Sequence, residues 1–418
     1  MLSKCMGASR VMYNMRTTRP DWLEAALFHS DWGLRGAFQS CTGLAVSDAQ
    51  WAQAALPLSK GGLGFRSAAT HAPAAYLASR LATRRLCREV DAAFVWEESL
   101  PGSGINAARC AYNTVVAGAE ALPPEALTAD QTPLPQKFLS AKLDAAVATR
   151  LLSISCPIDK ARLRAVSAPH ASAWLNALPS PSLHQRMSHA EFVASLQLWL
   201  GMSPMSHDTW CPKCDQSLDK RGLHALSCMA GGDAILCHNA LRDHVYLTAK
   251  AAGLCPEREE AGLLKDDPRR RPGDLFFAVW PDGEPVAMDF AVTSPVQQRR
   301  VAEAAGRTLA AAEAYEEQKL ADRSTGDRCR HFGLRLVPMI AESYGGWGLT
   351  AQKAFKVIAR AGAARNGKTV SDMTSQLYSG LSIKLMRANA RSLLARVSSE
   401  VDSGRPEGRA RTMLEATS

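Results

Sequence analysis

Four residues within a stretch of 18 have the types and spacing of a zinc site. Cys211 and Cys214 are separated by two residues, and His224 and Cys228 by three. Three thiolates and one imidazole form a closed tetrahedral set, whereas a catalytic zinc keeps one position for water. So short a loop is typical of a zinc knuckle, which commonly binds single-stranded or distorted nucleic acid. The alternative is four unrelated core residues, because unligated cysteine often packs as a small hydrophobic side chain.

Two aspartates stand at one end of a predicted β-hairpin. Asp274 precedes an apolar stretch at 275–280, and Asp289 lies within a second at 286–293. A turn on the first two residues of 281–283 places the aspartates directly opposite each other, with Cβ atoms about 4.5–5.5 Å apart. A turn on the last two places them diagonally, about 7–8 Å apart. Both registers put the side chains on one face of the sheet, and a one-residue bulge would separate them.

Paired carboxylates beside apolar strands are unfavourable unless a cation neutralises them. Mg²⁺ binds one or two carboxylates together with phosphate oxygens, and it activates water for phosphodiester hydrolysis. Such a nuclease also needs a cation near the scissile phosphate. Lys319 is the candidate because it extends the helical face of Ala312 and Tyr315, although a lysine near a helix end is usually a solvated surface charge. Glu260 or its neighbour Glu259 could supply a further Mg²⁺ ligand or be an exposed acid.

The composition is that of a globular protein with a basic surface. Of 418 residues, 46% are hydrophobic and 21% charged, and 49 Lys and Arg against 40 Asp and Glu leave a net charge of +9. This excess favours a polyanionic partner. The basic residues cluster in two places, although such charges also occur on ordinary solvated helix faces. The candidate nucleic-acid contacts are Arg269, Arg270, Arg271, Lys353 and Lys356.

Cysteine usage predicts the compartment. The eleven cysteines are odd in number and scattered outside the zinc cluster, and no secretory leader is recognised, so a reducing environment is expected. No run of uninterrupted apolar residues approaches the length of a membrane span. We expect an intracellular protein, nuclear in a eukaryote, that is neither secreted nor bound to a membrane.

The order of predicted elements indicates an α+β protein that is mostly helical. Strand patterns appear only after the cysteine cluster, in the order helix, strand, strand, helix, strand, which is typical of a small α/β domain. Pro73 is expected at the start of its helix. The predicted helices span residues 21–28, 72–88, 136–153, 161–178, 188–200, 237–252, 299–323, 350–361 and 369–396, and the predicted strands residues 275–280, 286–293 and 332–340.

A glycine-rich segment at 56–65 lies between two of these helices. It reads Leu-Pro-Leu-Ser-Lys-Gly-Gly-Leu-Gly-Phe, and its glycines could cradle a phosphate. However, no Gly-Lys-Ser/Thr follows and no strand precedes it, as a P-loop requires. We interpret the segment as a turn between helices.

The motif order resembles the C-terminal end of non-LTR retrotransposon polyproteins that carry a restriction-like endonuclease of the PD-(D/E)XK type. The resemblance touches most of residues 1–350 and is most specific around the cysteine cluster and the two aspartates. Residues 56–64 and 169–180 look like the region that follows the reverse transcriptase core. The remaining motifs are Arg271-Pro-Gly-Asp274, Asp289-Phe-Ala-Val-Thr293, the helix with Lys319, Val337-Pro-Met-Ile-Ala-Glu342 and Gly345-Gly-Trp-Gly348.

The resemblance implies a role for each candidate residue. The four residues of the cysteine cluster are knuckle ligands of a structural zinc ion, and Asp274 and Asp289 hold the catalytic metal. The usual Asp-X-Lys triplet is Asp289-Phe-Ala291 here, so Lys319 takes the place of the catalytic lysine. The tyrosine often found after this lysine is absent, and a glycine separates Pro272 from Asp274. No aromatic-X-Asp-Asp motif occurs, so this chain alone is not expected to act as a reverse transcriptase.

The expected organisation has six parts, in which a thumb-like remnant and a connector precede the knuckle and the nuclease. They are a helical reverse-transcriptase thumb-like remnant at 1–95, a helical connector at 96–205, the zinc knuckle at 206–236, a restriction-endonuclease-like domain at 237–350, basic C-terminal helices at 351–397 and a disordered tail at 398–418.

The leading hypothesis is a Mg²⁺-dependent endonuclease that nicks target DNA. The element's RNA and a separate or upstream polymerase region are further candidate partners. The missing lysine and tyrosine positions favour an alternative, a catalytically decayed or domesticated zinc-knuckle fragment that only binds nucleic acid. A third interpretation is a helical protein-interaction module with a structural zinc. From sequence, loss of zinc is expected to weaken nucleic-acid binding without unfolding the nuclease domain.

Overall fold

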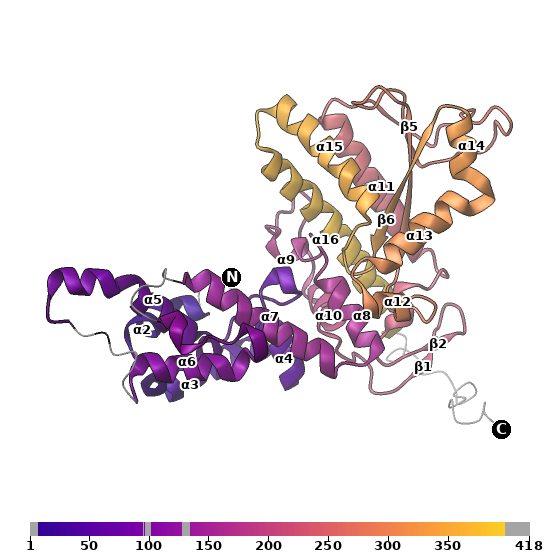
Figure 1. Ribbon diagram of the computed structural model, residues 1–418. Helices are drawn as coiled ribbons and strands as arrows, with labels where there is room; N and C mark the ends of the chain where they lie inside the picture. The colour runs from indigo at the N-terminus through magenta and orange to yellow at the C-terminus, as the bar shows by residue number, and fades with distance from the viewer. Residues whose placement is uncertain (1–6, 95, 97–101, 128–133, 398–418) are drawn as a thin grey trace. The chain divides into compact units, whose positions relative to one another are not determined.

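The computed structural model describes residues 7–94, 96, 102–127 and 134–397, and the tail predicted at 398–418 lies outside them. The chain divides into two compact units, Met1–Ser155 and Cys156–Ser418, which are described separately (Figure 1). Helices dominate, and the two sheets have two and four strands, so the predicted class, α+β and mostly helical, is confirmed. Within the described ranges, none of the helices has the length and hydropathy of a membrane span.

Unit 1 consists of helices joined by short 3₁₀ turns. Its α-helices are α2 (Met12–Thr17), α3 (Pro20–Thr42), α4 (Asp48–Ala55), α5 (Ala68–Val90), α6 (Gly104–Val115) and α7 (Gln136–Ile154), and its 3₁₀ turns are η1 (Ala8–Arg10), η2 (Leu58–Lys60), η3 (Gly118–Glu120) and η4 (Pro124–Leu127).

Helix α5 forms the centre of unit 1, where it packs against α2, α3, α6 and α7. It begins four residues before the predicted start at 72 because Asp31 caps its first turn. The Asp31 carboxylate accepts hydrogen bonds from the backbone amides of Ala68 (2.8 Å) and Ala69 (3.2 Å), which stabilises a helix start. Pro73 therefore lies inside the helix and not at its beginning, so that prediction was wrong.

Residues of the expected connector at 96–205 belong to both units. Helices α6 and α7 pack with α5 around the fully buried side chains of Tyr112 and Leu139. The boundary between the units falls after Ser155. The first half of the predicted connector is thus part of the core of unit 1.

Within its described residues, unit 2 contains both sheets together with nine α-helices and two 3₁₀ turns. Its strands are β1 (Thr209–Trp210), β2 (Ser217–Leu218), β3 (Pro256–Arg258), β4 (Leu275–Phe277), β5 (Val286–Thr293) and β6 (Arg335–Glu342). Among the described residues its helices are α8 (Pro157–Val166), α9 (Ala173–Asn176), α10 (His189–Leu200), α11 (Asp233–Ala251), α12 (Val301–Gly306), α13 (Ala310–Ala321), α14 (Thr325–His331), α15 (Leu349–Asn366) and α16 (Val370–Val397), with 3₁₀ turns η5 (Leu223–Leu226) and η6 (Asp322–Ser324).

The larger sheet has the strand order β3-β4-β5-β6, antiparallel except for the parallel pair of β5 and β6. Helices α11, α15 and α16 cover one face, where Val286, Met288 and Phe290 are buried (Figure 1). On the other face α13 and α14 lie against β6, and Ala287 packs with α14. Because both faces are covered, β5 is apolar except for Asp289 and the terminal Thr293.

Two of the predicted helices are interrupted. Residues 161–178 form α8 and α9 with a turn between them, in which His170 has a φ of 63°. Residues 299–323 form α12 and α13, separated where Leu309 has a φ of 64°. The apolar periodicity runs through both breaks, so the sequence pattern did not reveal them. Helix α14 and strand β3 were not predicted.

Candidate zinc centre and active site

The structure brings the four residues of the cysteine cluster together. Their ligand atoms all lie within 4.8 Å of one another. The Cys214 Sγ lies 3.1 Å from His224 Nε2 and 3.5 Å from Cys228 Sγ. Zinc bonds of about 2.3 Å to sulfur and 2.0 Å to nitrogen place tetrahedral ligands roughly 3.5–3.8 Å apart. The cluster, completed by Cys211, can therefore hold a metal ion, and its ligand types are compatible with zinc.

Short elements hold the ligands in place. The β1–β2 hairpin contains the first two cysteines, and the amide of Cys211 donates to the carbonyl of Gln216 (2.7 Å). Asp215 closes the turn with a φ of 54°. His224 lies in η5, and its backbone amide donates to the Asp219 carboxylate (3.2 Å). These bonds satisfy backbone groups in a loop too short for a core of its own.

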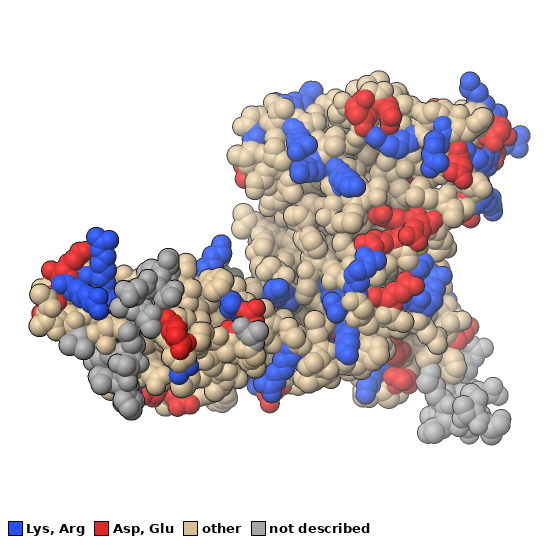
Figure 2. Space-filling model, in the orientation of Figure 1, with Lys and Arg blue, Asp and Glu red and all other residues tan. Residues whose placement is uncertain are grey.

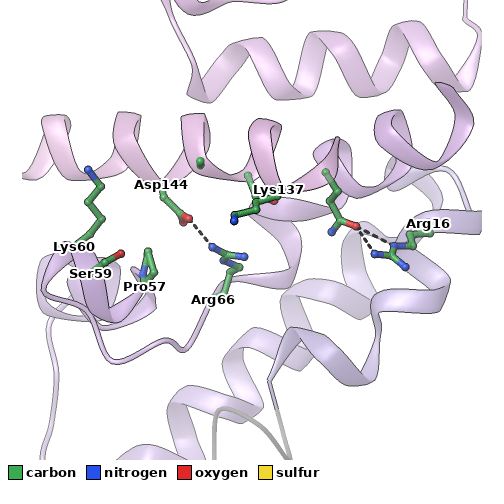
Figure 3. A pocket seen from close by; sticks show the side chains of 10 residues that line it. Arg16, Pro57, Ser59, Lys60, Arg66, Lys137 and Asp144 are labelled. Carbon is green, nitrogen blue, oxygen red and sulfur yellow. Dashed lines mark hydrogen bonds and ion pairs between the residues drawn. The ribbon is translucent and has the colours of Figure 1, made fainter. Parts of the chain in front are cut away.

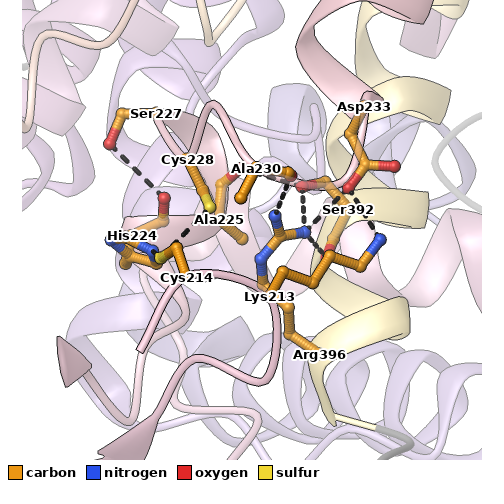
Figure 4. A network of polar contacts seen from close by, with 10 residues as sticks. All are labelled: Lys213, Cys214, His224, Ala225, Ser227, Cys228, Ala230, Asp233, Ser392 and Arg396. Carbon is orange, nitrogen blue, oxygen red and sulfur yellow. Dashed lines mark hydrogen bonds and ion pairs between the residues drawn. The ribbon is translucent and has the colours of Figure 1, made fainter. Parts of the chain in front are cut away.

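The C-terminal end of α16 packs against the zinc cluster (Figure 4). The Arg396 side chain is fully buried there, and it donates to Asp233 Oδ2 (3.0 Å) and Ser392 Oγ (2.7 Å). Burial opposes its ionisation, but hydrogen bonds to the Cys228 sulfur and to Asp233 raise the pKa of Arg396, so the guanidinium stays charged. A zinc ion with three thiolates and a neutral imidazole carries a net charge of about −1. With the ion bound, Arg396 would offset that charge.

The loop that contains the cysteine cluster consequently packs against the rest of unit 2. Gly222, with a φ of 71°, lies so close to α16 that a Cβ there would be 2.2 Å from Leu393 Cδ1. The Ser392 hydroxyl donates to the carbonyl of Ala225 in η5 (2.9 Å). Because α16 also packs under the larger sheet, this shared packing argues against the expectation from sequence that loss of zinc does not unfold the predicted nuclease domain.

The hairpin register places Asp274 directly before β4 and Asp289 within the neighbouring strand β5. Leu275 of β4 pairs with Met288 of β5, which is the register of a turn on the first two residues of 281–283. Asp274 and Asp289 are therefore the two residues next to the Leu275–Met288 pair, with which the β4–β5 ladder ends. The alternative, diagonal register does not occur.

A close backbone approach explains the glycine before Asp274. A Cβ on Gly273 would lie 2.9 Å from the carbonyl oxygen of Met288, so only glycine fits without displacement. The amide of Asp274 donates to that same carbonyl (2.8 Å). The glycine that interrupts the expected Pro-Asp pair thus lets the chain reach β5.

The Asp274 carboxylate is fixed by two further contacts. Its Oδ2 accepts a hydrogen bond from the Phe290 amide (2.7 Å) and lies 3.1 Å from His238 Nε2. Burial raises the pKa of Asp274; the Phe290 bond opposes this change, and the neighbouring charge of Asp289 adds to it. The two carboxylates therefore influence each other electrostatically.

Lys319 reaches the site from helix α13. Its Nζ lies 2.9 Å from Asp289 Oδ2 and 3.2 Å from Asp289 Oδ1. Burial favours the neutral amine, but the Asp289 charge outweighs it and raises the pKa of Lys319, with a smaller contribution from Asp274. The structure thus brings Lys319 into contact with Asp289 and within electrostatic range of Asp274.

His238 was missed by the sequence reasoning. It lies on α11 beside the buried stripe of Cys237 and Leu241, and its side chain is 28% exposed. Arg242, four residues later on α11, forms a 2.8 Å ion pair with Glu259. The sequence did contain a signal for this residue. His238 and Arg242 are four residues apart, next to the apolar stripe, and therefore lie on one face of the helix.

The predicted additional Mg²⁺ ligand is not joined to the aspartates. No hydrogen bond or ion pair of the described residues links half-buried Glu260 to Asp274 or Asp289. Its neighbour Glu259 pairs with Arg242 and Arg271. Among the described residues, only the cysteine cluster gathers three or more candidate metal ligands. The carboxylate site therefore offers two aspartates.

Two of the five predicted nucleic-acid residues form part of an exposed stripe. Lys353, Lys356 and Arg360 are exposed on α15 at spacings of three and four, which places them on one helix face. Figure 2 shows basic side chains along α15 on the visible face of unit 2.

The three consecutive arginines before β4 have different surroundings. Arg269 is exposed. Arg270 is half-buried and donates to the Thr325 hydroxyl at the start of α14. Arg271 forms a 2.6 Å ion pair with Glu259. Arg269 is therefore the member of this run most accessible to a polyanion.

A buried glutamate accepts a hydrogen bond at the start of α13, the helix that carries Lys319, and is expected to make stability depend on pH. Glu342 is 1% exposed and accepts a hydrogen bond from the Ala312 amide (3.2 Å) in the first turn of α13. Burial raises the pKa of Glu342 from 4.5 to about 7. Between these values the unfolded chain loses this proton and the folded chain keeps it, so stability falls as pH rises from about 4.5 to 7.

Replacing Glu342→Gln should remove this loss, because the amide keeps an acceptor and cannot ionise. At pH 8 we expect the variant to gain up to roughly 3 kcal/mol in free energy of unfolding relative to the parent. Urea unfolding at pH 5 and pH 8 measures it. If the free energy of unfolding changes between pH 5 and pH 8 by the same amount in the parent and in the variant, Glu342 ionises without a cost to stability.

Comparison with known proteins adds no family to this description. No protein-family model matches the chain and no curated protein matches it significantly, so its functional assignment depends on the geometry of the two sites.

Proposed function

We propose that unit 2 is a Mg²⁺-dependent endonuclease that nicks DNA. The observation that carries the proposal is the contact of the Lys319 ammonium with Asp289 inside β5, beside Asp274, which directly precedes β4. Two carboxylates and one ammonium group from three separate elements are a suitable set for phosphodiester hydrolysis.

Each residue has a distinct task in this proposal. Asp274 and Asp289 would hold the Mg²⁺ ion, which when bound lowers the pKa of water and stabilises the leaving oxygen. The Lys319 ammonium would face a phosphate oxygen on which negative charge develops. His238 and the Phe290 amide fix Oδ2 of Asp274, and we infer that this leaves Oδ1 for the metal.

The remaining surfaces suit a DNA substrate. The exposed stripe of Lys353, Lys356 and Arg360 on α15 would contact phosphates. Phosphate contacts of this kind position a duplex without reading its sequence. The zinc knuckle would add a second contact, in keeping with the use of such modules on nucleic acid.

The test is conversion of supercoiled plasmid to nicked circle by the zinc-loaded full chain. Cleavage is expected with Mg²⁺ and none when Mg²⁺ is omitted from a buffer that retains zinc. The double variant Asp274→Asn/Asp289→Asn, purified in parallel, controls for contaminating nucleases. Equal nicking by the parent and this variant would exclude the proposal.

The exposed α15 stripe also supports a second candidate function, that of a nucleic-acid-binding protein without cleavage. Binding that weakens steeply with salt, together with no nicking in Mg²⁺ or Mn²⁺ by a folded chain, would favour this candidate over the nuclease.

A further inference from the structure

A basic pocket lies within unit 1, apart from the zinc and carboxylate sites of unit 2. Its volume is about 460 Å³. Four cationic side chains line it: Arg16 from α2, Lys60 from η2, Arg66 from the segment before α5, and Lys137 from the first turn of α7 (Figure 3). Their convergence from four segments indicates a site for an anion.

The positive charge of the pocket is only partly balanced. Asp144 is the one acidic lining residue, and its Oδ2 lies 2.6 Å from Arg66, while its Oδ1 lies 3.2 Å from His71 Nε2. Arg16 donates two hydrogen bonds to the neutral amide oxygen of Gln136 (2.9 and 2.8 Å), which does not balance its positive charge.

Two lysines add to the excess of positive charge in the pocket. No hydrogen bond or ion pair to another described residue occupies the ammonium group of Lys60 or of Lys137. The start of α7 lies at the pocket without a side-chain cap, and a helix N-terminus carries partial positive charge. An anion in the pocket would therefore meet several donors at once.

The side chains, and not the glycine backbone, would make the contacts. In the segment at 56–65, the amides of Gly61, Gly62 and Gly64 donate to backbone carbonyls. A Cβ on Gly62 would lie 1.9 Å from the Leu56 oxygen. The segment is a closed turn between α4 and α5, and its glycines serve to present Lys60 at the rim.

We propose that this pocket binds a phosphodiester group of a nucleic-acid strand. Cationic side chains in a cluster suit a phosphate, and arginine can bind it through two parallel hydrogen bonds. The lining contains no aromatic side chain on which a nucleotide base could stack. The pocket is therefore suited to a backbone phosphate and less to a free nucleotide.

The test measures binding of a fluorescent single-stranded and a duplex oligonucleotide to the full chain across a salt series, without Mg²⁺ so that cleavage cannot interfere. The variant Lys60→Ala/Lys137→Ala should reduce the slope of log K against log salt by about one, which corresponds to roughly eightfold weaker binding near 0.1 M salt. The matched control Arg10→Ala/Arg88→Ala removes two exposed charges of unit 1 outside the pocket and should change neither quantity.

The results of this test distinguish a phosphate of a nucleic-acid strand from a small phosphate ligand. A pocket-specific loss with either oligonucleotide supports the proposal. Equal effects of both double variants, or no effect of the pocket variant, overturn it. Parent-level oligonucleotide binding by the pocket variant, combined with weakened binding of inorganic phosphate, also overturns it in favour of a small phosphate ligand. None of these results depends on whether the aspartate site cleaves DNA.

Discussion

Exchanging either aspartate of the carboxylate site for asparagine is expected to suppress Mg²⁺-dependent nicking at least ~100-fold, comparable to the loss of one stabilising group in a transition state. Asp289→Asn removes a metal ligand and the counter-charge of Lys319, whose Nζ is 2.9 Å away. Asp274→Asn removes the second carboxylate but can keep the bond from the Phe290 amide. Both variants are nearly isosteric, so the fold and the DNA affinity should be retained, although Asp289→Asn should lower stability because Lys319 loses its ion-pair partner.

Initial rates of plasmid nicking and fluorescence anisotropy with a DNA duplex measure the two effects. Asp282→Asn is the matched control, because it removes one exposed carboxylate from the other end of the same hairpin. We expect this control to nick DNA at the parent rate. Wild-type rates in both site variants, with the control also unchanged, would remove Asp274 and Asp289 from the catalytic role.

Substituting Cys211→Ser should release the zinc ion and also destabilise unit 2. Cys211 is fully buried, and the metal gives the short loop its order. Without zinc, Arg396 would lose the negative charge that it offsets while remaining buried beside Asp233. Removing one partner of a buried charge costs about 3–5 kcal/mol, so the destabilisation should be of that order.

Zinc content by mass spectrometry and urea unfolding check this expectation. Cys255→Ser replaces an exposed cysteine outside the cluster and should retain one zinc ion per chain with unchanged stability. One equivalent of zinc in purified Cys211→Ser protein would contradict the ligand assignment. If the variant loses zinc but keeps the stability of the parent, the expectation from sequence is correct and the metal-binding loop does not stabilise the rest of unit 2.

Local signals predicted much of the fold. Strand β5 (Val286–Thr293) has the predicted bounds because a continuous apolar run marks it. Helix α10 begins after Ser188, as predicted, where the side chains of Ser188 and Glu191 form a capping box. The failures occurred where tertiary contacts decide, as when Asp31 moves the start of α5.

In the candidate site, too, residues marked by a local sequence pattern were predicted, and residues placed by tertiary contacts were not. Regular spacing along one segment was enough to group the cysteine cluster and to place Lys319 on a face directed at the sheet. His238 and Arg396 were not found, because their partners Asp274 and Asp233 lie 36 and 163 residues away in the chain. Nothing in the composition distinguishes a buried arginine that offsets thiolates from a solvated one on a basic helix.

The 28-residue helix α16 sets a limit on how the chain can be divided for expression. Its middle residues Leu377 and Leu381 belong to the core under the sheet, whereas its last turn carries Arg396. A fragment that stops before this turn would retain every zinc ligand but lose the cation that faces them. Useful boundaries for producing unit 2 alone therefore lie before Cys156 and beyond Val397, with the metal-binding loop and the helix kept in one piece.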